Sequence, residues 1–155
     1  AGQSRPGSGW GKSLAQSEGR RSIYIFSKRS LAVPELALLD APNSADSCSQ
    51  RAVSTTGPQA LTFLNGSFMT TAAAGLASRL LSEAGSDPAA QVQLAFRLTL
   101  CRSPGSEELK FSTGFLQAQA RLPSGDKSQA DDPARRALKA FCLVLLNTNE
   151  FAYTR

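Results

Sequence analysis

The side chains that carry most enzyme chemistry are scarce in this chain. It contains no histidine, which excludes Ser-His-Asp and Cys-His nucleophiles, histidine acid–base catalysis and histidine-ligated metal or haem within it. The three cysteines, Cys48, Cys101 and Cys142, lie far apart, without the paired spacing of a zinc or iron–sulfur site or a disulfide framework. Cys101 and Cys142 fall in apolar helical patterns, where a free cysteine behaves as a small hydrophobic residue. We therefore predict no catalytic residue and no metal ligand.

Four polar residues near predicted helix ends are the candidates for an anion or ligand site. Arg51 and Gln59 flank a loop that runs into a helix N-terminus, where free N–H groups can hold an anion. Asn149 and Glu150 follow the most apolar segment and could form the polar rim of a ligand groove. The simpler interpretation is structural: Arg51 pairs with Glu150 or an aspartate, and Asn147, in a left-handed conformation, ends the preceding helix.

Two other groups of charged residues also have both a functional and a structural interpretation. Arg102 with Glu107 or Glu108 is typical of an ion pair across a turn, which at an exposed position stabilises by about 0–1 kcal/mol. Asp131 and Asp132 are adjacent carboxylates, as in acid–base or metal sites. We prefer helix capping for this pair, because a proline follows it directly.

The charge balance is basic but dispersed. The net charge of +5 comes from 17 basic and 12 acidic residues, and the basic ones occur in pairs rather than in a run. Such a surface could attract phosphate or anionic polysaccharide, although solvated surface is the commoner explanation. Nucleic acid is a less favoured partner, and no apolar stretch reaches the ~20 residues that span a bilayer.

From Pro58 onward the pattern predicts helices separated by short breaks. Gly85 ends the second helix, Asp87 followed by Pro88 opens the third, and Gly105 precedes the fourth. The second should bury one stripe: Phe68, Ala72, Leu76, Leu80 and Ala84. The last has an apolar arc wider than one face needs, so we predict that it is the central helix. The expected helices cover residues 58–64, 67–84, 88–101, 106–122 and 134–147.

The first third of the chain is less regular. Residues 1–19 should be an extended or disordered lead-in. Residues 20–31, with Tyr24 in an apolar run, fit either a short strand or a helix. Pro34 and Pro42 bracket a short segment, 35–39, and a long loop follows. The predicted fold is mainly α: a small irregular bundle of about five helices with an extended N-terminal segment and, where 20–31 forms one, a short strand. It forms one helical domain over 20–155.

Several sequence blocks, in order and spacing, resemble one family. The order and spacing are similar to the C-terminal domain of unknown function in the large planctomycete cytochrome-c-associated proteins, from about Gly9 to Tyr153. Gly105 stands where that family usually has a Thr or Ser cap, and Leu143 where many relatives have a polar residue or histidine. The blocks are Arg20–Tyr24; Cys48, Arg51, Thr55 and Pro58–Leu61; Leu64, Asn65 and Phe68; Ala95–Leu98, Arg102, Pro104 and Glu107–Leu109; and Leu145–Phe151.

The resemblance implies that the chain is the C-terminal part of a longer exported or envelope-associated protein. Such parents often carry an upstream cytochrome-c-like domain, so haem would lie elsewhere in the parent and the compartment would be extracytoplasmic. The partners implied are the other domains of the parent, with polysaccharide as a further candidate. The chain itself has no Cys-x-x-Cys-His motif for attaching haem.

Three functions fit these observations. The leading one is a non-catalytic helical module that completes its parent or docks partner domains, so this piece alone is not expected to be an enzyme. The second is part of the substrate groove of a cytochrome-coupled oxidoreductase acting on carbohydrate, which rests on analogy alone. The third is a helix-turn-helix nucleic-acid binder, suggested by the basic isoelectric point.

Overall fold

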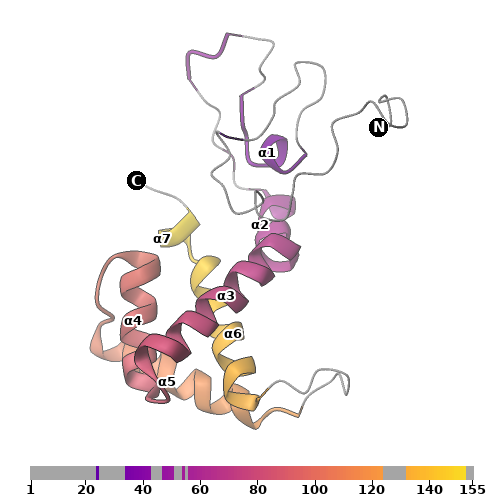
Figure 1. The fold of residues 1–155 in the computed structure, drawn as a ribbon. Helices are drawn as coiled ribbons and strands as arrows, with labels where there is room; N and C mark the ends of the chain where they lie inside the picture. Colours follow the sequence, from indigo (N-terminus) through magenta and orange to yellow (C-terminus); the bar gives the residue numbers. More distant parts are fainter. Residues whose placement is uncertain are drawn as a thin grey trace. The chain divides into compact units, whose positions relative to one another are not determined.

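The computed structural model describes residues 24, 34–42, 47–50, 54, 56–123 and 132–152 of the chain (Figure 1). The chain forms two compact units, Ala1–Ser54 and Thr55–Arg155. The predicted lead-in over 1–19 lies outside the described residues. So does the strand-or-helix segment over 20–31, except for Tyr24, whose side chain is exposed rather than part of a core.

Among its described residues, the first unit has a short helix that the sequence analysis did not predict, α1 over Pro34–Leu38. Proline suits the first turn of a helix because its missing N–H would have no partner there. The turn after α1 places Asp40 at a positive φ of 57°, a conformation that aspartate tolerates better than most residues. The Asp40 carboxylate then accepts hydrogen bonds from the Ser54 N–H and hydroxyl, at 2.8 and 2.7 Å.

The second unit is built from helices, as predicted. No strand occurs among the described residues, so the mainly α fold class is confirmed. The five expected helices are present, and a short sixth, α7, follows them. Their bounds are α2 Gly57–Asn65, α3 Ser67–Ala84, α4 Pro88–Leu100, α5 Ser106–Arg121, α6 Pro133–Leu146 and α7 Asn149–Ala152.

Local signals set most helix ends. The Asp87 carboxylate accepts hydrogen bonds from the Ala89 and Ala90 N–H groups at 3.1 and 3.2 Å, which confirms the predicted cap of α4. Gly85 ends α3 at a φ of 65°, where a side chain would be strained. Asp132 does precede α6, but its carboxylate makes no capping hydrogen bond, so the expected capping contact is wrong.

The end of α6 also differs from the expectation. Asn147 adopts φ −100° and ψ 1° rather than a left-handed conformation. It ends the helix by another route, since its side-chain amide donates to the Leu143 carbonyl at 2.7 Å and to the Phe63 carbonyl at 3.3 Å. These bonds satisfy a helix-end carbonyl and tie the end of α6 to α2.

The core is organised around α6, which packs against α3 and α5 (Figure 1). This confirms the prediction that the most apolar helix is central. Among the large apolar side chains of α6, that of Val144 is the exception to this burial, because it is 51% exposed. The buried apolar residues of the second unit are Met69, Ala73, Ala77, Leu80, Val92, Ala95, Phe96, Leu116, Ala137, Leu138, Phe141, Cys142, Leu145 and Leu146.

The buried stripe of α3 is not the predicted one. Phe68, expected inside, is 66% exposed, whereas Met69, Ala73 and Ala77 are buried. Leu80 is buried as expected. The helix carries so many alanines that its apolar arc is broad, and packing against α6 selects which side of that arc is buried. The helix is therefore rotated about its axis relative to the prediction.

Candidate functional site

Among the residues that the structure describes, a group of charged side chains in mutual contact lies at the turn between α4 and α5. The Arg102 guanidinium binds Glu108 through Nη1 and Nη2, at 2.8 and 2.7 Å. It also binds Glu150 of α7 through Nε and Nη2, at 2.7 and 2.9 Å. One arginine therefore forms two bidentate carboxylate pairs and joins the α4–α5 turn to α5 and α7. We call these three residues the Arg102 clamp.

The backbone of the turn places Arg102 for these contacts. Cys101 adopts a left-handed conformation with φ 56°, which reverses the chain after α4. Gly105 then precedes α5 in an extended conformation, and its N–H donates to the Glu108 carboxylate at 2.7 Å. The guanidinium carbon lies 5.3 Å from the centre of the Phe96 ring, within the range of a cation–π contact. The turn thus holds the arginine between an aromatic face and two carboxylates.

These contacts shift the acid–base behaviour of all three groups. Hydrogen bonds from Arg102, and then from the Gly105 N–H, lower the pKa of Glu108 from 4.5 to about 2. Hydrogen bonds from Arg102 also lower the pKa of Glu150. The pKa of Arg102 rises, chiefly through its hydrogen bonds to Glu108 and then to Glu150. Each group is therefore held in its charged form near neutral pH.

The clamp is saturated as a binding group. A guanidinium has five N–H donors, and Arg102 makes five hydrogen bonds, the fifth from Nη1 to the Ser103 carbonyl at 3.3 Å. No donor is left for an external phosphate or carboxylate. The expected pair of Arg102 and Glu108 is confirmed. The partnership with Glu150, 48 residues away, was missed because sequence spacing carries no signal at that separation.

The structure places the four candidate ligand residues in different settings. Arg51 lies outside the described residues. Gln59 is buried in the first turn of α2, and its side-chain oxygen accepts the Thr56 N–H at 3.0 Å. Asn149 and Glu150 adjoin in α7, where Asn149 is exposed and Glu150 belongs to the clamp. Gln59 and Glu150 therefore both make structural hydrogen bonds, and whether any of the four binds an anion or ligand stays a prediction.

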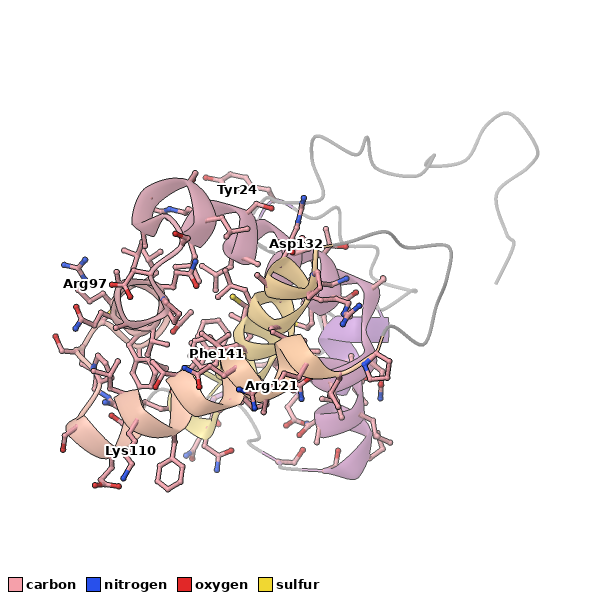
Figure 2. The ribbon with its side chains drawn as sticks, turned by 90° about the horizontal axis from the view of Figure 1, so that it is seen from below. Tyr24, Arg97, Lys110, Arg121, Asp132 and Phe141 are labelled. Carbon is pink, nitrogen blue, oxygen red and sulfur yellow. The ribbon has the colours of Figure 1, made fainter. Side chains whose placement is uncertain are left out.

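An open apolar groove of about 670 Å³ runs between α5 and α6. Its walls include Phe115 and Phe141, whose ring centres lie 6.3 Å apart. Phe111 and Val144 also line it and are largely exposed, at 75% and 51%. Figure 2 shows Lys110 and Arg121 toward opposite ends of α5, with Phe141 between them where α6 crosses α5.

The comparisons with known proteins identify a family. Residues 3–116 match the profile of PSD1, described as a protein of unknown function (DUF1553). The chain belongs to this family. A search of curated proteins and a search of solved structures each gave no match. The PSD1 match includes α1 to α4 and most of α5, and it ends before the 145–151 block and before α6.

The structure also bears on membrane and metal binding in this PSD1 chain. Among its described helices, none has both the length and the hydropathy needed to cross a bilayer. Likewise, no three Cys, Asp or Glu side chains in the described ranges gather around a point where they could share a metal ion.

The clamp gives this PSD1 chain a predictable response to acid. Because folding lowers the pKa of Glu108 from 4.5 to about 2, its contribution to stability is complete above pH 4.5 and is lost as the pH falls toward 2. Replacing Arg102 with Gln should remove most of this contribution of Glu108 to the free energy of unfolding. Urea denaturation should therefore show the variant less stable than the wild type at pH 6, with the difference shrinking toward pH 2.

The matched control is Arg97→Gln, an exposed arginine on α4 (Figure 2) for which the structure shows no ion pair among the described residues. It should follow the wild-type pH profile. A difference between Arg102→Gln and wild type that stays constant from pH 6 to pH 2 would mean that Arg102 contributes by packing on Phe96 and not through its charge.

Proposed function

We propose that this chain is a non-catalytic helical module that docks onto another domain of a larger parent protein. The observation that carries the proposal is the group of large apolar side chains exposed on α2 and at the start of α3. Leu61 is 59% exposed, Leu64 51% and Phe68 66%. We call these three residues the α2–α3 patch.

The patch has the geometry of an interaction surface. Leu61 and Leu64 are three residues apart and share one face of α2. Phe68 follows in the first turn of α3, just after the chain changes direction at Gly66. Figure 1 shows α2 stacked on the N-terminal end of α3, so the patch lies at one end of the bundle. Burying each side chain against a partner would contribute about 1.5–3 kcal/mol before the costs of association.

Family membership and the sequence resemblance support the choice of partner. The patch residues lie within the part of the chain that matches the family, and their exposure leaves them free to contact a partner. We infer a parent of the planctomycete cytochrome-c-associated type, exported or envelope-associated and therefore extracytoplasmic. Haem in such a parent would be bound by an upstream domain, and this chain would hold no cofactor.

The test is a binding measurement between this chain and the remainder of its parent. Calorimetry should detect association, and Leu64→Asp with Phe68→Asp should weaken it at least about tenfold, equivalent to 1.4 kcal/mol. Phe151→Asp, which changes a phenylalanine on α7 that is 38% exposed, is the matched control and should bind like wild type. Absence of binding by the wild-type chain would contradict the proposal.

A turnover assay separates docking from a share in catalysis. The haem-loaded parent should keep its turnover when this module is deleted. A fall in turnover with haem retained would instead support the alternative in which the module forms part of a carbohydrate-oxidising groove. The two readouts are independent, so a failure of docking and a discovery of catalysis give different results.

A further inference from the structure

A second exposed face, on α5, has a pattern that the proposed function does not use. Five exposed residues repeat along this helix at alternating intervals of four and three. This spacing places them on one face, as in the seam of two packed helices. We call the five residues the α5 strip: Glu107, Phe111, Gly114, Ala118 and Arg121.

The α5 strip is complementary to itself when reversed. Glu107 lies seven residues before Gly114 and Arg121 lies seven residues after it, roughly 10 Å on either side along the helix. Two copies of α5 that cross antiparallel at Gly114 therefore bring each Glu107 opposite the Arg121 of the other copy. A twofold interface forms every such contact twice.

The centre of the strip allows two helices to approach closely. At Gly114, a Cβ atom would meet no other atom within 4 Å, so the helix backbone is open to a partner. Ala118, one turn further on, is also small and exposed. In the antiparallel arrangement Phe111 of one copy lies over Ala118 of the other, beside the groove that Phe115 and Phe141 line. The exposed Phe111 side chain of each copy would thus occupy the groove of the other copy.

The end charges of the strip are available for a partner. Neither Glu107 nor Arg121 forms an ion pair within the described residues, whereas Glu83, Glu108 and Glu150 all do. Lys110 flanks the strip one turn inside Glu107, and its flexible stem can keep the ammonium group in solvent. The charge pattern therefore favours a second copy of this chain over a uniformly acidic or basic partner.

We propose that the chain forms an antiparallel twofold dimer through the α5 strip, with Phe111 of each copy seated at the α5–α6 groove of the other. The dimer is independent of the proposed docking function, which uses the α2–α3 patch. Loss of either interaction therefore leaves the other measurable.

The test is sedimentation equilibrium of the full chain at increasing concentration. At about 0.15 M salt the Debye length of about 8 Å screens the repulsion between two basic copies more than it screens contact ion pairs. The wild type should show reversible dimerisation. Glu107→Arg and Arg121→Glu should each weaken it about tenfold, because each places like charges opposite one another twice. The double variant should recover most of the wild-type affinity.

Two further variants complete the experiment. Gly114→Leu should abolish dimerisation by holding the helices apart, while circular dichroism stays that of a folded chain because the position is open. Arg97→Glu, a charge reversal on exposed α4, should leave dimerisation unchanged. A wild type that stays monomeric at millimolar concentration would overturn the proposal. So would a dimer that tolerates Glu107→Arg, or a double variant that shows no recovery.

Discussion

Leu138→Ala is expected to lower the free energy of unfolding by about 3–4 kcal/mol, the effect of removing a large side chain from a site that cannot collapse around the cavity. Leu138 is 1% exposed and lies on α6, the helix that packs against both α3 and α5. A cavity there loosens two helix interfaces at once. A domain of this size has only about 5–15 kcal/mol of stability, so much of the total would be lost.

Urea denaturation followed by circular dichroism measures this effect, with the slope of the transition showing whether the variant still unfolds in one step. Val144→Ala is the matched control, because it shortens an apolar side chain on the same helix at a position that is 51% exposed. In dilute solution its effect should stay within about 0.5 kcal/mol. A loss below 1 kcal/mol for Leu138→Ala would contradict the central position of α6.

The sequence predicted the helices of the second unit because their signals are local. Asp87 before Pro88 and Gly85 at a positive φ each act within one helix turn, so the residues at those positions suffice to place a boundary. The wide apolar arc of α6 is also a property of its own residues. Two short helices, α1 and α7, were missed because a helix of one turn has too few residues to show a period.

The buried face of α3 could not be predicted from the sequence, for a different reason. Phe68 and Met69 are neighbours in sequence, and the alanine-rich pattern that follows allows either to face inward. The choice depends on the shape of α6, which lies far along the chain. Cys101 shows the same limit. Its apolar helical pattern indicated a small hydrophobic residue of the helix, but it is exposed just after α4 in a left-handed conformation. Its position follows from the turn that delivers Arg102 to its two carboxylates.

The contacts of the candidate site also differ in whether they could be predicted from local sequence. The pairing of Arg102 with Glu108 was predictable because six residues separate them across one turn. The pairing with Glu150 spans 48 residues and needs the tertiary fold. Glu150 was predicted as a ligand residue because it is a polar residue that follows an apolar helix. In the structure its carboxylate accepts hydrogen bonds from Arg102. The α5 strip was also missed, because its complementarity becomes visible only when a second copy of α5 is considered.

Cys142 is expected to react with a thiol reagent at least about a thousandfold more slowly than the other two cysteines in the folded chain. Cys48 and Cys101 are exposed, whereas Cys142 is fully buried. Burial raises the pKa of the Cys142 thiol to about 12, so at pH 8 the reactive thiolate would be a fraction on the order of 10⁻⁴ even if the reagent could reach it. Ellman's reagent should therefore titrate two thiols quickly and the third slowly.

The variant Cys48→Ser with Cys101→Ser isolates Cys142, and all of its thiol should react at once in concentrated guanidinium. In native buffer the rate should follow the opening of the α6 core, because the reagent reaches the sulfur only when that core opens. Adding Leu138→Ala, which weakens the same core one helix turn away, should accelerate the reaction about tenfold for each 1.4 kcal/mol of stability lost. A fast native reaction, or one that Leu138→Ala leaves unchanged, would show that α6 is not held as a unit between α3 and α5.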